Sequence, residues 1–335
     1  MQHSEVIHNS TLKNVIDSIG NTPLIELNRV FAASNFKVYG KMEAANPSGS
    51  LKDRTSVNIL KEALLLGYIK PGDTIIESSS GNMALGLAQA CLYFKLKLIV
   101  VVDPKINSHT KKLLNAYGAK IEYVTKPDPE KGFLGARLQR VHELLENIPN
   151  SFWTNQYGNK KNPEAHLVTM KEMFGALEDP LDYLFVTVST CGTLMGCADY
   201  ISQNRLKTKL IAVDALGSIL FGDEKSNRLI PGHGSSVKSN FLDKNFVHDA
   251  VKVSDLECVK GCWSLLKNEG ILAGGSTGGA ISAINKYADS IPKGSSCGMI
   301  ICDRGERYLD TIYSSDWILD NFNSKDNNLS FLNNE

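Results

Sequence analysis

Short, continuous apolar segments recur along the chain and alternate with longer segments of helical character. The runs Leu98–Val102 and Met299–Cys302 lack the polar alternation of a strand with one solvent-facing side, so they are typical of parallel strands covered on both faces. The predicted strands are Lys37–Met42, Thr74–Glu77, Lys97–Val102, Lys120–Val124, Asp182–Val188, Lys209–Asp214, Val251–Val253 and Gly298–Cys302.

Helix-like segments lie between these strands. Several end at a glycine, such as Gly67, Gly118 and Gly270, which suits a left-handed helix C-cap. The predicted helices are Asp53–Leu66, Asn82–Phe94, Ser108–Tyr117, Phe133–Glu146, Pro163–Leu177, Gly192–Gln203, Asp255–Asn268 and Thr277–Ser290. This alternation predicts an α/β fold with parallel sheets flanked by helices, and 335 residues suggest about two domains or lobes.

The charge balance excludes some classes of function. The 36 Lys and Arg residues equal the 36 Asp and Glu residues, so the broad basic surface that binds nucleic acid or an anionic membrane is not predicted. The first residues show no basic and apolar signal region, and no apolar run approaches the ~20 residues of a membrane span. We therefore expect a cytoplasmic protein that binds neither nucleic acid nor membrane.

The seven Cys residues show no C-x-x-C pair and no Cys/His set with zinc spacing. Their odd number and scatter indicate buried free thiols in a reducing compartment. No metal site is predicted.

Four segments rich in Gly, Ser and Thr follow a predicted strand or begin a predicted helix. Ligands bind at this position in open α/β sheets, where backbone N–H groups and helix N-termini suit anions. One such segment is weak support, but four in one chain predict a shared polar pocket. They are Asn46–Arg54, Glu77–Asn82, Val188–Thr193 and Ala273–Gly279.

Some alternative motifs fail. Gly274–Gly278 reads G-x-S-x-G, but a serine hydrolase of that type needs a His after the nucleophile, and all seven His residues precede Ser276. Neither a dinucleotide-binding G-x-G-x-x-G after the first strand nor a Walker loop is present.

The residues alone allow two interpretations of Lys52. It is a surface charge, or it is a partly desolvated lysine that forms a Schiff base. The other three polar segments favour the Schiff-base lysine, because a pyridoxal phosphate pocket needs a phosphate-binding loop and partners for the ring nitrogen and ring hydroxyl.

Seven motifs then occur in the order of one known family. With them the chain resembles the fold-type-II pyridoxal-phosphate enzymes of the cysteine synthase and cystathionine β-synthase group, from about Ile16 to Trp317. The resemblance implies two lobes of the tryptophan synthase β type, with the cofactor between them. The motifs are IGNTPLIEL (19–27), NPSGSLKDR (46–54), SSGN (79–82), NQYGNKKNPEAH (155–166), STCGT (189–193), EGILAGGSTG (269–278) and GERYLDT (305–311).

The resemblance implies roles for individual residues. Lys52 matches the lysine that forms the Schiff base, Asn82 the side chain at the ring hydroxyl, and Ser276 the serine at the ring nitrogen. The phosphate loop is matched by Ser189, Thr190, Cys191, Gly192 and Thr193. The residues matched to substrate binding are Ser78, Ser79, Ser80 and Gln156, with Asn82 beside them.

The resemblance also implies a reaction. A neutral serine at the ring nitrogen leaves the ring a weaker electron sink than an Asp partner would, which favours β-elimination over transamination and racemisation. Lys52 would remove the α-proton, the β-leaving group would depart to give an aminoacrylate, and a nucleophile would add at Cβ. We expect a transferase of this β-replacement type.

Departures from the family pattern argue against an ordinary cysteine synthase. Ser189 and Cys191 replace two glycines of the usual G-T-G-G-T loop, Met83–Ala84 replaces a T-G after the Asn, and Asp303–Arg304 changes the P-S-x-G-E-R motif. The chain resembles instead the branch that uses O-phospho-L-serine and L-glutamate to make precursors of 2,3-diaminopropionate for siderophores. The similar segments are 102–106, 127–137, 153–159 and 213–236.

Such substrates call for cations and hydroxyl groups at the mouth of the pocket. The candidates are Arg137, Tyr157 and Ser189, with Lys160, Lys161 and Arg304 behind them. A solvent-exposed charge stays the alternative for Arg137, and for Lys160 and Lys161 it is favoured. We expect His166 to be a structural hydrogen-bonding residue, because Lys52 already supplies the base.

Two alternatives to this function stay open. One is synthesis of cysteine or another β-substituted alanine from O-acetylserine or O-phosphoserine, and the other is a non-catalytic partner that kept the fold. The retained Lys52, Asn82 and Ser276 argue against the second.

The resemblance also implies an organisation of the chain. We expect a smaller lobe over 39–150, a larger lobe over 12–38 and 151–320, and a flexible tail over 321–335. The family is usually dimeric, and the apolar segment around 24–31 suits an interface, so we expect a homodimer.

Overall fold

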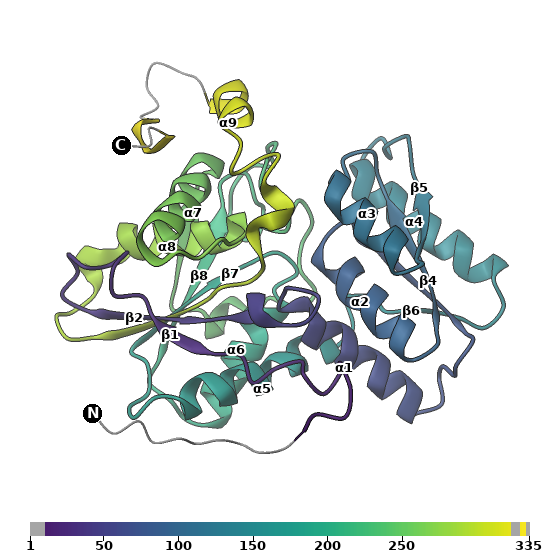
Figure 1. The fold of residues 1–335 in the computed structure, drawn as a ribbon, viewed down its shortest axis with the longest axis horizontal. Helices are drawn as coiled ribbons and strands as arrows, with labels where there is room; N and C mark the ends of the chain where they lie inside the picture. The colour runs from purple at the N-terminus through teal and green to yellow at the C-terminus, as the bar shows by residue number, and fades with distance from the viewer. Residues whose placement is uncertain (1–10, 323–328, 333–335) are drawn as a thin grey trace.

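Alternate residues of the central strands enter different cores, as the continuous apolar runs predict. In β7 (Tyr183–Thr187), Tyr183 and Phe185 pack into one core and Leu184 and Val186 into another. β8 (Lys209–Ala215) divides its residues in the same way. These strands are therefore buried on both faces by helices. The computed structural model describes residues 11–322 and 329–332 (Figure 1).

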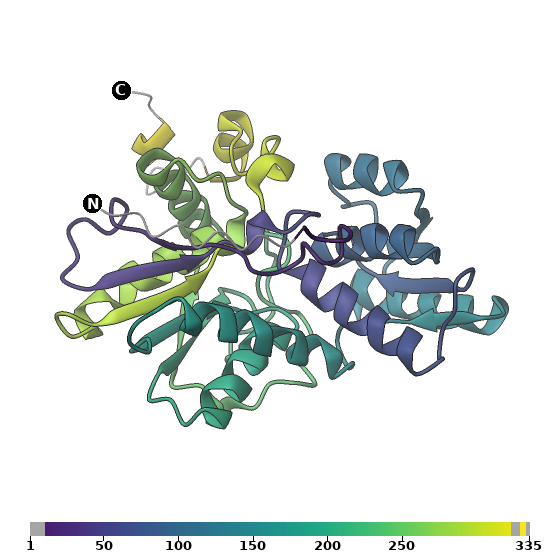
Figure 2. The same ribbon diagram turned by 60° about the horizontal axis from the view of Figure 1, so that its bottom comes forward.

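The larger sheet has the strand order β1-β2-β10-β7-β8-β9. β1 (Leu24–Glu26) is antiparallel to β2 (Lys37–Lys41), and β10 (Ser296–Ile300) and β9 (Asp249–Val253) complete the parallel part. Figure 2 shows one helix pair beneath this sheet and another above it. The lower pair is α5 (Lys161–Gly175) and α6 (Gly192–Gln203), and the upper pair is α7 (Asp255–Glu269) and α8 (Gly275–Tyr287).

The smaller sheet is fully parallel, with the order β5-β4-β3-β6. Its strands are β3 (Thr74–Ser78), β4 (Lys97–Val102), β5 (Lys120–Tyr123) and β6 (Ser151–Trp153). One face is covered by α1 (Lys52–Leu65), α2 (Asn82–Tyr93) and α3 (Ser108–Ala116), and the other by α4 (Gly132–Asn147). We call the two units the small lobe and the large lobe (Figure 1).

α1 joins the two lobes, because it packs against α2 of the small lobe and α5 of the large lobe. The α1–α2 crossing is close at Gly86, where a Cβ atom would lie 2.7 Å from Ser56 Oγ and 3.0 Å from the Lys52 carbonyl oxygen. A glycine is therefore required to keep α2 against the first turn of α1. This contact fixes the start of α1 relative to the loop that precedes α2.

Most predicted elements are present within a few residues of their predicted ends, and Gly270 ends α7 in the left-handed conformation. β1, β6 and α9 (Ser315–Phe322) were not predicted, since three-residue strands and a helix of eight residues show little periodicity.

The sheets depart from the predicted lobe boundaries at both ends. β2 begins before residue 39 and pairs with β1 and β10, so it belongs to the larger sheet throughout, whereas β6 lies after residue 150 and pairs with β3. The predicted tail is also not uniform. Its first two residues complete α9, and residues 330–332 form a 3-10 helix whose Phe331 packs against Trp263 of α7. Residues 323–328 and 333–335 of that tail lie outside the described part of the chain.

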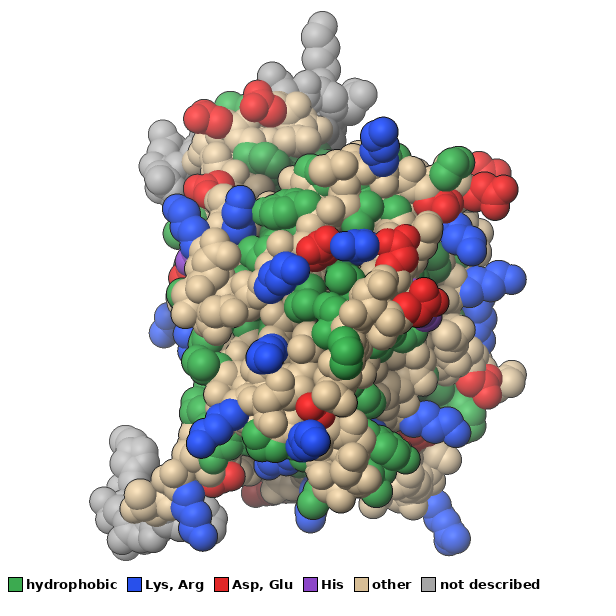
Figure 3. All heavy atoms as spheres, turned by 90° about the vertical axis from the view of Figure 1, so that its right-hand side faces the viewer, with side chains coloured by type: hydrophobic (Ala, Val, Ile, Leu, Met, Phe, Trp, Pro, Cys, Tyr) green, Lys and Arg blue, Asp and Glu red, His purple; other side chains and the backbone are tan. Residues whose placement is uncertain are grey.

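The surface and the thiols agree with the composition. Figure 3 shows the outer face of the small lobe, where charges of both signs are scattered among apolar side chains. All seven Cys residues are free and buried. Within residues 11–322 and 329–332, no helix has the length and apolar character needed to cross a membrane, and no cluster of three or more His, Cys, Asp or Glu residues could hold a metal ion.

Candidate active site

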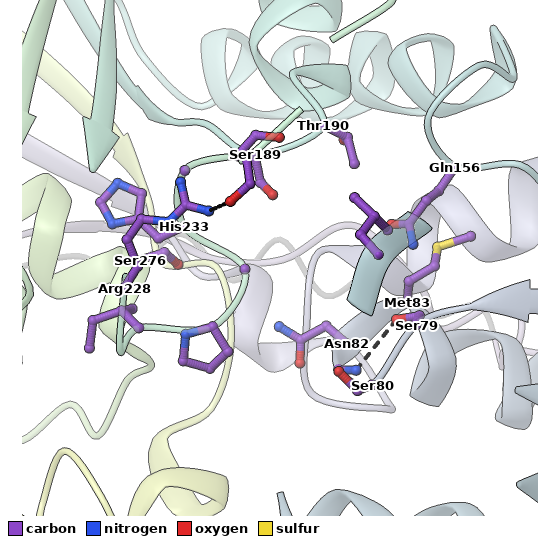
Figure 4. A pocket seen from close by; sticks show the side chains of 18 of the residues that line it. Ser79, Ser80, Asn82, Met83, Gln156, Ser189, Thr190, Arg228, His233 and Ser276 are labelled. Carbon is purple, nitrogen blue, oxygen red and sulfur yellow. Dashed lines mark hydrogen bonds between the residues drawn. The ribbon is translucent and has the colours of Figure 1, made fainter. Parts of the chain in front are cut away.

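The four polar segments converge on one cavity of about 760 Å³ that both lobes line. Figure 4 shows residues of the large lobe facing residues of the small lobe across it. The large-lobe residues labelled there are Ser189, Thr190, Arg228, His233 and Ser276, and the small-lobe residues are Ser79, Ser80, Asn82 and Met83. The predicted shared pocket is therefore present.

Lys52 is the first residue of α1 and faces this cavity. Burial lowers the pKa of its amine. The nearby Cys302 and Asp303 raise that pKa, but by less than burial lowers it. A lowered pKa favours the neutral amine, which is the form that acts as a nucleophile or a base.

The two residues after Lys52 hold its loop in place. Asp53 accepts a hydrogen bond from the backbone N–H of Ser48 (2.7 Å). The buried Arg54 guanidinium pairs with Glu43 (2.7 Å) and with Glu172 of α5 (2.6 Å). The Lys-Asp-Arg run therefore combines a pocket lysine with two buried structural charges, and it is not a solvated charge cluster.

On the small-lobe side, a buried carboxylate organises the loop after β3. Glu77 accepts hydrogen bonds from Thr154 Oγ1 (2.5 Å), the Gln156 N–H (3.2 Å) and the Ser78 N–H (2.8 Å). Burial raises the pKa of Glu77, although these bonds oppose the shift. Gln156 Nε2 also donates to the Ser78 carbonyl oxygen (3.2 Å), so the serine loop and the Gln156 loop are fixed together.

The predicted substrate loop lies at the cavity. Ser78, Ser79, Ser80 and Gln156 all line it. Ser78 Oγ is buried with no hydrogen-bond partner among the described residues, so its hydroxyl is available to a ligand.

Asn82 begins α2 and is held by the far end of the chain. Its Nδ2 donates to Asp303 Oδ2 (2.8 Å), and its Oδ1 accepts a hydrogen bond from Arg307. Tyr308 OH donates to the same Asp303 oxygen (2.6 Å). Since Nδ2 carries two N–H groups, Asn82 keeps a donor for a ring hydroxyl while Asp303 and Arg307 fix its orientation.

The large-lobe loop 189–193 precedes α6. Cys191 adopts φ +65°, the left-handed region that favours glycine, which explains why the resembling enzymes have glycine there. Ser189, Thr190, Cys191 and Thr193 line the cavity, whereas Gly192 lies behind them, where a Cβ would collide with Asn162. The N-cap residue Cys191 makes no side-chain cap hydrogen bond, and the Gly192 N–H has only a long contact to Thr190 Oγ1 (3.4 Å), so the start of α6 can donate to an anion.

Neutral side chains hold this loop from behind. Thr193 Oγ1 lies 3.2 Å from His166 Nε2, and Thr55 Oγ1 lies 3.4 Å from the same nitrogen. Burial lowers the pKa of His166 well below its ordinary value, and the charges of Lys52 and Arg54 act in the same sense. The ring is therefore neutral and structural, as expected. Asn162 Nδ2 donates to the Gln156 carbonyl oxygen (2.7 Å) and connects the loop to the small-lobe side.

Ser276 lies in the first turn of α8 and lines the cavity. Cys302 lies in the cavity as well. Burial and the charge of Asp303 raise the pKa of its thiol, whereas hydrogen bonding to Thr187 and Ser276 opposes the shift.

The residues predicted for acidic substrates separate into two groups. Arg137 lines the cavity, and its Nε lies 3.6 Å from Asp103 Oδ2. Its side chain is only 14% exposed, so the alternative of a solvent-exposed charge is wrong. Tyr157 and Ser189 line the cavity too. Lys160 is exposed, Lys161 pairs with Glu62 and Glu164, and neither lines the cavity.

Arg304 was predicted to lie near the substrate, and this prediction is wrong because Arg304 does not line the cavity. Its side chain is exposed, and its Nε donates to the Ala44 carbonyl oxygen (2.9 Å), away from the cavity.

Sequence reasoning missed several functional candidates. Arg228 and His233 line the cavity, Tyr308 does so near Asp303, and Arg307 reaches Asn82 from behind. All four lie in segments that were recognised as motifs, so the signal was present. No single-residue pattern distinguishes these side chains from their neighbours.

These groups fit pyridoxal phosphate. A buried amine whose pKa is lowered is available at Lys52 for the aldehyde, N–H groups at the start of α6 with Thr190 and Thr193 suit the phosphate, and Ser276 suits the ring nitrogen. The unpartnered Ser78 hydroxyl suits a further polar group of the ligand. The cavity is also within the usual size range of small-molecule sites.

Comparisons with known proteins agree with this geometry. Residues 15–303 match the family model "Pyridoxal-phosphate dependent enzyme". The chain is 41% identical over 91% of its length, and 91% of the relative, to N-(2-amino-2-carboxyethyl)-L-glutamate synthase of Ralstonia nicotianae.

Solved structures show the same fold. An O-acetylserine dependent cystathionine β-synthase from Helicobacter pylori is 32% identical with a TM-score of 0.84, covering 91% of this chain and 100% of its own. O-ureido-L-serine synthase is 28% identical with a TM-score of 0.85, covering 93% of this chain and 100% of its own. This chain belongs to the family of pyridoxal-phosphate dependent enzymes.

Proposed function

We propose that this enzyme joins O-phospho-L-serine and L-glutamate by β-replacement, giving N-(2-amino-2-carboxyethyl)-L-glutamate and phosphate. The observation that carries the proposal is the 41% identity, over nearly the whole of both chains, to a synthase named for that product. The Arg137, Tyr157 and Ser189 side chains at the cavity support it, because they suit acidic substrates.

The charge of the cavity supports the same substrates. The chain has no net charge, yet the cationic side chains that line the cavity outnumber the two carboxylates, Asp103 and Asp303. Such a local excess attracts phosphate and dicarboxylates without a basic surface elsewhere. Apart from Lys52, the cations are Lys105, Lys131, Arg137, Lys225 and Arg228.

The residues divide the work of the reaction. When bound, pyridoxal phosphate supplies an electron sink for negative charge at Cα of the amino acid. We assign to the Lys52 amine, whose pKa burial lowers, the removal of the Cα proton and its later return. Ser276, which lines the cavity, would be an uncharged partner for the ring nitrogen, which would limit the electron sink and suit elimination over transamination.

The small lobe handles the first substrate in this proposal. Ser78, Ser79 and Ser80 with Asn82 hold its α-carboxylate, and Arg137 binds its phosphate. The Cβ–O bond breaks and phosphate leaves with the bonding electron pair. The glutamate amine then forms the C–N bond at Cβ and loses a proton.

One experiment tests this function. Purified holoenzyme is mixed with O-phospho-L-serine and either L-glutamate or sulfide, and the products are identified by mass. We expect the glutamate adduct and one phosphate per turnover. Ready formation of cysteine with no glutamate adduct would overturn the proposal, and a chain that never binds pyridoxal phosphate would overturn any catalytic role.

Synthesis of a C–S bond is the second candidate. It is favoured by the likeness to the cystathionine β-synthase and to a hydrogen sulfide-producing enzyme from Fusobacterium nucleatum, 30% identical with a TM-score of 0.83, covering 89% of this chain and 100% of its own. The sulfide arm of the same experiment, repeated with O-acetylserine, distinguishes it.

The setting of the reaction is also part of the proposal. The product would supply 2,3-diaminopropionate for a siderophore, and the enzyme would act in the cytoplasm as a homodimer. Seven free buried thiols suit a reducing compartment. The edge strand β1 and the segment that follows it offer a surface for a second copy.

A further inference from the structure

The cavity has a second guanidinium that the roles above leave unused. Arg137 belongs to α4 of the small lobe, whereas Arg228 belongs to the loop between β8 and β9 of the large lobe. Figure 4 shows Arg228 beside His233 and Ser276, across the cavity from Ser80 and Asn82. The two guanidinium groups therefore lie in different lobes, one positioned by a helix and the other by a loop.

Arg228 is held at one end and unsatisfied at the other. Its Nη2 donates to Ser236 Oγ (2.8 Å). Its Nη1 is buried and has no hydrogen-bond partner, and Arg228 forms no ion pair, among residues 11–322 and 329–332. A buried donor without an acceptor is unfavourable, so the group is suited to a bound anion.

The neighbouring carboxylates do not fill this need. Asp255 accepts hydrogen bonds from the N–H groups of Leu229 (2.9 Å) and Ile230 (3.2 Å), which fix the backbone next to Arg228. Asp214 lies within electrostatic range but forms no ion pair with Arg228. Burial lowers the pKa of Arg228, while Asp214 and Asp255 only oppose that shift, so the positive charge stays under-compensated.

We propose that Arg228, oriented by Ser236, binds a side-chain carboxylate of the incoming amino-acid nucleophile. The inference rests on the proposed function, because only a nucleophile such as glutamate brings such a carboxylate, and sulfide brings none. Both anionic groups of the first substrate already have partners in the small lobe, Ser78–Asn82 and Arg137. The free half of a fixed planar guanidinium on the opposite side is therefore left for the second substrate.

Arg228→Gln tests this role, because it removes the charge and the guanidinium while keeping a polar side chain. We expect the KM for L-glutamate to rise about tenfold to a hundredfold, the usual effect of losing a charged hydrogen bond. The KM for O-phospho-L-serine and the change in cofactor absorbance on adding it should stay within twofold. Arg205→Gln, at an exposed arginine outside the cavity, is the matched control.

Two further readouts do not depend on turnover or on which nucleophile reacts. Glutarate has both carboxylates of glutamate and no amine, so its binding to the holoenzyme can be measured by calorimetry, and Arg228→Gln should weaken it about tenfold. In competition, the wild type should prefer L-glutamate to L-glutamine as nucleophile, and Arg228→Gln should lose most of that preference.

The outcomes separate this inference from the proposed function. Unchanged glutarate binding and an unchanged KM for L-glutamate in Arg228→Gln would overturn the inference while the function stands, as would a rise confined to the KM for O-phospho-L-serine. Failure of the wild type to make a glutamate adduct would overturn the function instead. If Arg228→Gln does not fold, Ser236→Ala frees the guanidinium, and a KM for L-glutamate unchanged by it would count against the proposal.

Discussion

A buried carboxylate fixes the small-lobe side of the pocket, whereas neutral side chains fix the large-lobe side. Glu77 holds the Ser78 loop through three hydrogen bonds. The loop 189–193 is held instead by His166 and Asn162. The Ser78 loop, which we propose binds substrate, is therefore tied to a titratable acid, and the loop 189–193, which we propose binds phosphate, is tied to a histidine whose pKa burial lowers.

The two sides should respond to pH in opposite directions. Burial raises the folded-state pKa of Glu77, so its contribution to stability is present at low pH and falls as the pH rises through that raised pKa. Burial lowers the pKa of His166, so its contribution is present above the ordinary value of 6.5 and falls as the pH drops toward the lowered pKa. Acid should therefore weaken the loop 189–193 first.

Lys52→Ala should have the largest effect, because it removes the one group that both sides serve. We expect turnover to fall by at least about 10²–10⁴-fold, the usual contribution of a positioned acid–base group. Steady-state rates and the visible spectrum measure this, and Lys61→Ala, at an exposed lysine of the same helix, is the control. Residual turnover above one tenth of the wild type would rule out the assigned role.

Arg137→Ala should affect the small-lobe side alone. Loss of a charged hydrogen bond costs about 1.5–3 kcal/mol, so we expect the KM for O-phospho-L-serine to rise about tenfold to a hundredfold with cofactor binding intact. The comparison with Arg228→Gln sharpens the difference between the sides, because each variant should raise the KM of a different substrate. Unchanged kinetics would return Arg137 to a purely structural pair with Asp103.

His166→Gln tests the neutral anchor. We expect a loss of about 1–3 kcal/mol at pH 7, because Thr193 and Thr55 lose their shared partner. Urea denaturation from pH 5 to 8 should also show that the variant lacks part of the wild-type loss of stability below pH 6.5. His248→Gln, at an exposed histidine, should follow the wild type. Equal acid slopes in wild type and His166→Gln would contradict the comparison.

The sequence predicted the parts of this site that depend on local chemistry. The continuous apolar strands and the four polar segments were enough to predict the α/β architecture and a shared pocket, and the family motifs placed Lys52, Asn82 and Ser276 at it. The large-lobe strands were found because their alternate residues enter two cores, which removes all polar positions from the run.

The remaining parts depend on long-range contacts. Arg137 and Arg304 look alike in sequence, and only the packing of α4 over the cavity and the turn of Arg304 toward Ala44 distinguish them. The unsatisfied nitrogen of Arg228 depends on Ser236 and on a loop held by Asp255. The observed sheets do not follow the predicted lobe boundaries, because strand pairing assigns β2 to the larger sheet and β6 to the smaller one. No local sequence pattern specifies that pairing.

Cys191→Gly should have the smallest effect and tests the strain in the large-lobe loop. Cys191 adopts φ +65°, a conformation that destabilises a non-glycine residue by about 1–2 kcal/mol. Glycine avoids this strain but loses more backbone entropy on folding, which costs about 0.5–1 kcal/mol. We therefore expect Cys191→Gly to be within about 1 kcal/mol of the wild type, and more stable than Cys191→Ala, which keeps the strain. Urea denaturation measures both. If Cys191→Ala proved the more stable of the two, the backbone at position 191 would be unstrained. The loop 189–193 would then not differ in backbone strain from the Ser78 loop that Glu77 holds.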